Sequence, residues 1–239
     1  MTTLFISDLH LSGERPDIIR LFKAFLQKEA THADALYILG DLFDAWLGDD
    51  AVLPDMIEVL EALADLTKSG IPVYVMAGNR DFLFGSQFET MTGCQLLPDP
   101  SVIDLYGTET LLMHGDTLCT DDIDYQIFRK QVRSPQWQQA VLAKSIEERI
   151  SIAREARAES KARTKEKAED IMDANPQAVA DSFRKHGVTR LIHGHTHRPA
   201  VHETLVDNNP VTRIVLGDWY EKASVLRVTA DSTELTAWP

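Results

Sequence analysis

The sequence predicts an α/β fold with a helical insertion, and three observations support this. Short apolar runs of strand length alternate with helical patterns through the first half of the 239 residues. After about residue 100 the apolar runs shorten and follow one another closely, which indicates a second sheet. Between 121 and 172 the chain is rich in helix formers and has no glycine, which indicates helices inserted between two core parts, 1–120 and 173–239.

Two segments of the first half have the apolar period of a core-facing helix. From Pro16 to about Thr31 the apolar positions are Ile18, Ile19, Phe22, Phe25 and Leu26. From Pro54 to Lys68 they are Met56, Ile57, Leu60, Leu63 and Leu66, and Gly70 predicts the end of the helix. The predicted strands of the second half are Val102–Leu105, Leu111–Met113, Val201–Leu205, Arg213–Leu216 and Ser224–Val228. We assign the last three of these to the second sheet.

Five of the predicted strands end in a polar motif. The strands are Leu4–Ile6, Ala35–Leu39, Val73–Met76, Leu111–Met113 and Leu191–His193. The motifs that follow them are Asp8-Leu9-His10, Gly40-Asp41, Gly78-Asn79-Arg80-Asp81, His114-Gly115 and Gly194-His195-Thr196-His197. Open α/β sheets bind ligands at strand ends, so we expect the five loops to converge on one edge.

Seven side chains of these motifs make a candidate metal centre, and they are Asp8, His10, Asp41, Asn79, His114, His195 and His197. Oxygen and imidazole ligands suit Mn, Fe(II) or Zn. Two such ions about 4 Å apart can bind a phosphoryl group and activate water. Any one of these residues alone could be an ordinary hydrogen-bonded loop residue. Five motifs in order, each after an apolar run, favour a metal pair.

The order Asp-x-His, Gly-Asp, Gly-Asn-x-Asp, His-Gly, Gly-His-x-His resembles that of the calcineurin-like metallophosphoesterases. The resemblance covers nearly the whole chain except roughly 121–170, and it implies two packed β-sheets flanked by helices. It implies that one metal is held by Asp8, His10, Asp41 and His197. It implies that the other is held by Asp41, Asn79, His114 and His195, with Asp41 as the bridge. Asp81 and Asp116, next to ligands, are expected to orient imidazoles.

The chain departs from the common family pattern at Arg80, where most members have histidine. Arginine stays charged and cannot act as a general acid, but it can bind phosphate and stabilise developing charge. A phosphate leaving group, with a second pKa of about 6, needs no proton, whereas a simple alkoxide does. Arg80 therefore favours cleavage of a pyrophosphate, although His195 could also supply a proton.

Longer strings resemble the UDP-2,3-diacylglucosamine hydrolase family of lipid A biosynthesis, and they are Leu36–Asp41, Trp46–Asp50, Gly78–Leu83, Met113–Thr120 and Ile192–Pro199. The resemblance implies hydrolysis of UDP-2,3-diacylglucosamine with two Mn²⁺ ions, by attack of water on the phosphate next to uridine. The products would be UMP and 2,3-diacylglucosamine 1-phosphate (lipid X). The implied catalytic residues are Asp41, Arg80 and His195. The implied substrate-binding residues are Asn79, Arg80, Asp122, Ser160, Thr164, Lys167 and His195.

The predicted insertion is basic in an acidic chain. From Arg129 to Lys167 there are eleven Lys/Arg and five Asp/Glu, a net of +6, whereas the whole chain has −13. One interpretation is a solvated helical face with ion pairs. The other is a substrate site, because Arg157, Ser160, Thr164 and Lys167 share one helical face.

The insertion also carries much apolar surface, from Phe128, Val132, Trp137, Val141, Leu142, Ile146, Ile150 and Ile152. Some of these side chains must pack the helices together. Others could line an acyl channel, with Trp46 and Phe82 at its edge on the core. An exposed apolar stripe beside Lys and Arg would also suit an anionic membrane surface.

Composition argues against several classes of protein. A net charge of −13 disfavours a general nucleic-acid binder. No stretch approaches the roughly 18–20 apolar residues of a membrane span, and Met1–Leu4 leads into the first strand without a signal-peptide pattern. With only Cys94 and Cys119, a disulfide framework is not expected, and Cys119 is expected to be packed rather than a metal ligand. We expect a cytoplasmic protein, peripheral on the inner membrane, without an obligate protein partner.

Two rival functions remain open at this point. The first is another phosphoesterase on the same core, such as a nucleotide pyrophosphatase, a dinucleoside polyphosphate hydrolase or a phosphodiesterase. The metal ligands cannot distinguish these activities, because they determine the type of reaction and not the substrate. The second is a non-catalytic scaffold, which would be expected to have lost ligands, whereas all seven are present.

Overall fold

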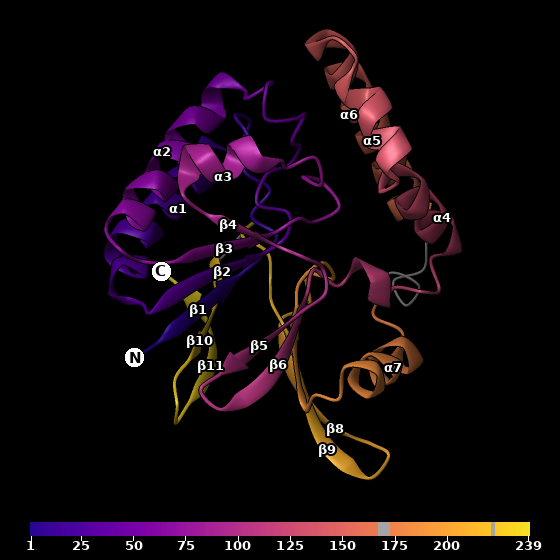
Figure 1. The fold of residues 1–239 in the computed structure, drawn as a ribbon. Coiled ribbons are helices and arrows are strands. Elements are labelled where there is room, and N and C mark those ends of the chain that lie inside the picture. Colours follow the sequence, from indigo (N-terminus) through magenta and orange to yellow (C-terminus); the bar gives the residue numbers. More distant parts are fainter. Residues whose placement is uncertain (167–172, 221–222) are drawn as a thin grey trace.

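The computed structural model describes residues 1–166, 173–220 and 223–239, and it contains two β-sheets with helices on their outer faces (Figure 1). The first sheet has the order β11-β10-β1-β2-β3-β4. Its strands are β1 (Thr3–Ile6), β2 (Ala35–Leu39), β3 (Val73–Met76), β4 (Gln95–Leu97), β10 (Ala223–Val228) and β11 (Thr233–Trp238). Strands β1 to β4 are parallel, β10 pairs antiparallel with β1, and β11 pairs antiparallel with β10.

The second sheet has the order β5-β6-β7-β9-β8. Its strands are β5 (Ser101–Leu105), β6 (Thr108–Met113), β7 (Arg190–His193), β8 (Ala200–Val206) and β9 (Asn209–Val215). Strands β6, β7 and β9 are parallel, so β6 and β7 both end on the same edge. Helix α7 (Pro176–His186) packs on this sheet through Val179 and Phe183.

Alternation along the strands builds the core between the sheets. In β1, Leu4 and Ile6 pack under the helices, whereas Phe5 faces the second sheet. Phe5 joins Leu112 and Ile192 of the second sheet in one buried cluster. Because both faces of the first sheet are covered, its central strands are apolar on both sides.

Helices α1 (Pro16–Lys28), α2 (Pro54–Lys68) and α3 (Ser86–Thr92) cover the outer face of the first sheet (Figure 1). Each of the first two starts at a proline, which suits the first helical position. The predicted core positions of α1 are buried, which confirms that prediction. In α2 Ile57 is 48% exposed, so its prediction as a core residue was wrong. Short 3₁₀ helices lie at Ala30–His32 and Asp116–Leu118.

The segment Ser224–Val228 corrects our sheet assignment, because it forms most of β10 in the first sheet. There Phe5 of β1 pairs antiparallel with Leu226. All residues of β10 except Arg227 are buried, which is the pattern of a strand covered on both faces. The apolar pattern predicted the strand but did not identify its partner, which lies more than 200 residues away.

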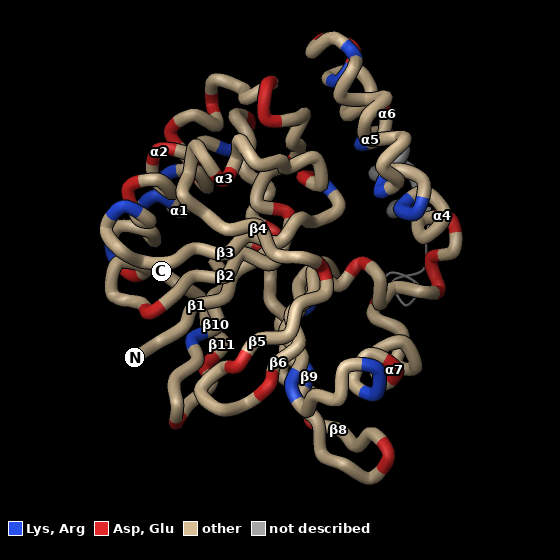
Figure 2. Tube along the Cα trace, in the orientation of Figure 1, with Lys and Arg blue, Asp and Glu red and all other residues tan. Residues whose placement is uncertain are grey.

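Three helices extend from the core as an arm that we call the cap (Figure 1), and they are α4 (Ile123–Val132), α5 (Pro135–Leu142) and α6 (Ile146–Glu166). Lys and Arg recur along it (Figure 2). Arg149 fixes α6 to the core through two 2.6 Å bonds to the carboxylate of Asp50 and one of 2.8 Å to the carbonyl of Leu47. No helix within the described ranges combines the length and apolar character needed to cross a bilayer.

Candidate metal centre and adjoining pocket

The seven predicted ligands come from two sheets, not from one edge of a single sheet. Asp8, Asp41 and Asn79 follow β1, β2 and β3, whereas His114 and His195 follow β6 and β7. The carboxyl ends of these parallel strands meet where the two sheets approach each other. The predicted ligands therefore do lie at the carboxyl ends of strands, but these strands belong to two sheets.

Tight backbone turns aim the ligands into this space. Asp8, Asp41, His195 and His197 have φ between 51° and 68°, a region that costs energy for residues other than glycine. Gly78 permits a close approach, because a Cβ there would collide with the side chain and backbone of Asp41. Strain held by surrounding structure in this way is typical of functional sites.

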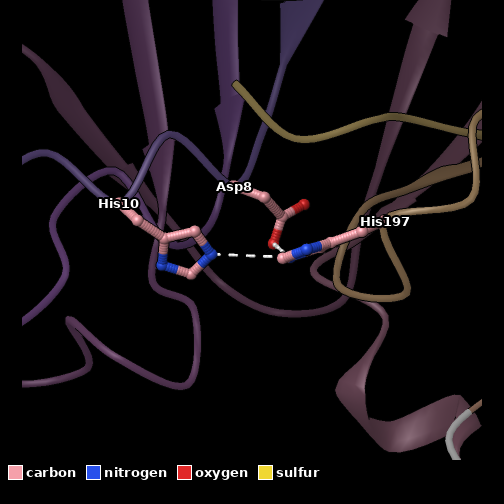
Figure 3. A group of neighbouring side chains, drawn as sticks. All are labelled: Asp8, His10 and His197. Carbon is pink, nitrogen blue, oxygen red and sulfur yellow. Dashed lines mark hydrogen bonds and ion pairs between the residues drawn. The ribbon is translucent and has the colours of Figure 1, made fainter. Parts of the chain in front are cut away.

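Asp8, His10 and His197 form the first ligand group, and their side chains point toward one another (Figure 3). His197 Nε2 lies 3.3 Å from Asp8 Oδ1 and 3.4 Å from His10 Nε2. The candidate ligand atoms of the three residues all lie within 4.8 Å of one another.

The second group lies around Asn79 and His114. Asn79 Oδ1 is 2.9 Å from both His114 Nε2 and His195 Nδ1. Asp41 faces both groups, with Oδ2 3.8 Å from His10 Nε2 and Oδ1 3.9 Å from His114 Nε2. All seven predicted ligands are therefore close together, and Asp41 lies where a bridging carboxylate would be needed.

These residues fit divalent cations. Asp8 and Asp41 are both nearly fully buried, and a pair of buried carboxylates needs compensating positive charge. Apart from its ion pair with His197, Asp8 Oδ1 accepts no hydrogen bond from the described part of the chain. His114 Nδ1 lies 3.0 Å from the carbonyl of Leu39, so it donates there and leaves Nε2 free to ligate. The donor set suits a hard or borderline metal.

The four histidines of the centre differ in the direction in which burial and neighbouring charges shift their pKa values. Burial lowers the pKa of His195 to about 3 and that of His10 to about 4, so both imidazoles are neutral at neutral pH. Burial would also lower the pKa of His114, but the carboxylates of Asp41 and Asp116 raise it to about 9. The carboxylates of Asp218 and Asp8 raise the pKa of His197 to about 10, although burial acts in the opposite direction.

A pocket of about 520 Å³ joins this centre to the cap. Asn79 and Arg80 line its end at the metal centre. Elsewhere its wall is mostly apolar, from Leu11, Trp46, Leu47, Phe82 and Leu83 of the core and Phe128, Val132, Trp137, Val141, Ile150 and Ile152 of the cap. Leu142 and Ile146, which we also considered for the channel, are each 39% exposed and do not line it.

Of the other predicted substrate residues, only Asp122 has a side chain that the structure describes. Asp122 is the N-cap of α4, and its carboxylate accepts a 3.1 Å hydrogen bond from the amide of Tyr125. Ser160 and Thr164 belong to α6, but their side chains are outside the described part of the structure. Lys167 lies outside the described residues altogether.

Two aspartates next to ligands have roles that differ from our prediction. Asp81 accepts hydrogen bonds from the amides of Gly78 (2.7 Å) and Phe43 (3.2 Å), so it shapes the loop that carries Asn79. Asp116 accepts bonds from Tyr125 Oη (2.6 Å) and Arg129 Nε (2.7 Å). Asp116 therefore ties the loop of His114 to α4 instead of holding an imidazole.

Sequence reasoning missed several residues that touch the ligands, among them Tyr125 and Asp218. The ring of Tyr125 stacks on that of His195, with centroids 5.9 Å apart. Asp218 Oδ2 lies 3.0 Å from His197 Nδ1. A signal for Asp218 was present, because Gly217-Asp218 follows a predicted strand just as Gly40-Asp41 does.

Comparison with known proteins agrees with the family resemblance that the sequence motifs indicate. A family model described as calcineurin-like phosphoesterase matches residues 1–199. A protein of Stenotrophomonas maltophilia (strain K279a), named UDP-2,3-diacylglucosamine hydrolase, is 52% identical over 242 residues and 98% of each chain. One of the same name from Serratia proteamaculans (strain 568) is 50% identical over all of both chains. The crystal structure of Chaetomium thermophilum Vps29 is similar in fold alone, with 14% identity, a TM-score of 0.50, and coverage of 100% of this chain and 96% of that one.

Proposed function

The chain belongs to the calcineurin-like phosphoesterase family, and we propose that it hydrolyses the pyrophosphate bond of UDP-2,3-diacylglucosamine. The products are UMP and 2,3-diacylglucosamine 1-phosphate, the lipid X of lipid A biosynthesis. The observation that carries the proposal is the pocket, because one cavity extends from Asn79 and Arg80, beside the cluster of metal-ligand types, along an apolar wall. The relatives at 50% and 52% identity that bear this name support the same substrate.

The seven clustered residues would hold two Mn²⁺ ions, one with Asp8, His10, Asp41 and His197, the other with Asp41, Asn79, His114 and His195. When bound, such ions supply Lewis acidity toward phosphoryl oxygens and activate water for attack. Asp41, which faces both groups, would be a ligand of both ions.

Arg80 binds and stabilises the reacting pyrophosphate. It lines the pocket next to Asn79, and its own amide donates a 2.8 Å hydrogen bond to Asp41 Oδ1, which fixes the loop. A guanidinium there can hold two phosphate oxygens and stabilise charge that develops in the transition state. Burial keeps His195 neutral at neutral pH, and this suits a leaving phosphate that needs no proton.

The cap, proposed to span 121–172, selects the acylated sugar. Its apolar side chains and those of the core line one cavity, whose volume is in the range of small-molecule sites. We propose that Ser160, Thr164, Lys167 and Asp122 contact the sugar and phosphate. We also propose that the protein works at the cytoplasmic surface of the inner membrane, which is supported by the exposed Ile123 and Ile127 on α4.

The test is hydrolysis of UDP-2,3-diacylglucosamine by the purified protein with Mn²⁺ in ¹⁸O-labelled water, with UDP-N-acetylglucosamine in parallel. We expect label in UMP and little turnover of the unacylated compound. Label in the sugar phosphate would move the attack to the other phosphorus. Equal turnover of both compounds would indicate a general nucleotide pyrophosphatase and would overturn the lipid assignment.

A further inference from the structure

We propose that Asp218 is a positioning residue that fixes His197 with its Nε2 directed into the metal centre. The inference rests on the proposed function only in so far as His197 is a metal ligand. It adds an eighth residue to the site, one outside the motifs that carry the seven ligands.

The two ring nitrogens of His197 have different partners. Nε2 faces Asp8 Oδ1 at 3.3 Å and His10 Nε2 at 3.4 Å, so it lies among the ligand atoms. Nδ1 lies 3.0 Å from Asp218 Oδ2, on the other side of the ring. A hydrogen bond from Nδ1 to the carboxylate selects the tautomer whose Nε2 lone pair is free, and it makes that nitrogen a stronger ligand.

His197 needs such a partner more than His114 does. His114 is fully buried, and the carbonyl of Leu39 accepts from its Nδ1 at 3.0 Å. The side chain of His197 is 31% exposed and lies on the loop after β7, so packing restricts its ring less. The bond to Asp218 is therefore the contact that selects one orientation of the ring.

Asp218 is itself held by its neighbours in the segment Gly217–Tyr220. Trp219 is fully buried, stacks edge-on against Phe25 at 5.4 Å, and donates its amide to the carbonyl of Asp8 at 3.3 Å. Asp218 Oδ1 accepts a 3.2 Å bond from the amide of Tyr220, which leaves Oδ2 for His197.

The same segment also touches the second imidazole of this group. The Tyr220 ring stacks on His10, with centroids 5.6 Å apart and planes at 19°. The segment therefore contacts Asp8, His10 and His197 in turn: through the Trp219 amide, the Tyr220 ring and the Asp218 carboxylate. One short piece of chain thus contacts all three residues of the first ligand group.

The test is Mn²⁺ binding to metal-free, full-length protein, measured by isothermal calorimetry and by electron paramagnetic resonance of the free ion. We expect Asp218→Ala to weaken binding by roughly 10- to 100-fold at one site, as loss of such a supporting carboxylate usually does. Asp218→Asn should lose less, because its amide oxygen still accepts from Nδ1. Asp231→Asn, in the exposed turn before β11, is the matched control and should bind as wild type does.

The results of these measurements distinguish a positioning role of Asp218 from a merely structural one. Wild-type affinity in Asp218→Ala would overturn the proposal. A merely structural role would lower the Tm of the metal-free variant but leave the Mn²⁺ affinity of the folded protein unchanged, and that result would also overturn the proposal. If Asp218→Ala does not fold, Asp218→Leu decides, because leucine has a similar size and accepts no hydrogen bond, and unchanged affinity there overturns the proposal. Weakened binding in a protein that does not hydrolyse UDP-2,3-diacylglucosamine would reject the proposed substrate and leave the role of Asp218 intact.

Discussion

Asp41 is the residue whose removal should affect both halves of the metal centre. Its two oxygens face different imidazoles, His10 and His114. We expect Asp41→Ala to lower kcat by about 10²-fold or more, since both ions would lose a ligand. Steady-state hydrolysis with saturating Mn²⁺ measures this, and exposed Asp65→Ala on α2 is the control. Near-normal kcat in Asp41→Ala would refute the ligand assignment.

Arg80 should act in the transition state. We expect Arg80→Ala to lower kcat by more than about tenfold, because charge that develops on the phosphoryl oxygens loses its partner. Arg80→Lys keeps the charge but loses the forked geometry, so an intermediate kcat is expected. Kinetics over a range of substrate concentrations separate the alternatives. A rise in KM with unchanged kcat would make Arg80 a residue of substrate binding only.

At the residue scale, the sequence predicted the ligands but not their supports. Each ligand follows a strand within a recognisable motif, so its place could be predicted from local pattern alone. Asp218 and Tyr125 reach the imidazoles only because distant segments are folded against each other. Asp81 and Asp116 were assigned to imidazoles because they are next to ligands in the chain, but their carboxylates point to backbone amides and to α4.

At the element scale, α4 connects the cap to the metal centre. Tyr125 and Arg129 bond to Asp116 from one face of the helix, and Arg133 donates to the carbonyl of Gly78 at 2.8 Å. These residues are spaced four apart, so they share that face. The loops that carry His114 and Asn79 are thus fastened to the same helix that lines the pocket. Movement of α4 would therefore displace both loops.

The apolar wall of α5 should determine affinity for acylated substrate. Trp137 lines the pocket, with its ring 6.0 Å from that of Phe82 across the boundary between cap and core. We expect Trp137→Ala to raise KM for UDP-2,3-diacylglucosamine about tenfold, which corresponds to about 1.4 kcal/mol. The control is Leu205→Ala, which removes an exposed side chain of β8 far from the pocket. Equal loss with short-chain and long-chain substrates would argue against acyl contact.

Elements were predicted unequally well from the sequence. Helices α1 and α2 have strong apolar periods and proline starts, so their positions were predictable. The strand β10 was predicted as a strand but assigned to the wrong sheet, because pairing partners are not encoded in a local pattern. The short α3 and β4, of seven and three residues, carry too few apolar positions to show a period.

At the scale of the whole molecule, metal binding should be linked to protons. Without metal, the raised pKa values of His114 (about 9) and His197 (about 10) keep both imidazoles charged at neutral pH. A metal needs them neutral, so binding at pH 7.5 should release about two protons per chain and strengthen as pH rises. Calorimetry in buffers of different ionisation enthalpy counts the protons. Proton release that does not fall by about pH 10 would contradict this assignment.

The same groups predict the stability of the metal-free protein. A histidine whose pKa is raised by folding stabilises the fold below its unfolded pKa of about 6.5 and loses that contribution as pH rises through the folded pKa. Metal-free protein should therefore lose stability between about pH 7 and 10, while Mn²⁺ should stabilise it increasingly over that range. Thermal unfolding with Mn²⁺ and with a chelator gives both curves. A gap in Tm that narrows with rising pH would be inconsistent with these two histidines.

The pairing of β1 with β10 has a consequence for biosynthesis. Phe5 is made more than 200 residues before its partner Leu226. Until then one side of β1 remains an open edge, the kind of surface that associates with other chains. His195, His197 and Asp218 also emerge late, so a nascent chain holding Asp8 and Asp41 has incomplete ligand sets. Binding of both metals must therefore await synthesis of these late segments, and the open edge of β1 remains exposed to association with other chains until β10 is made.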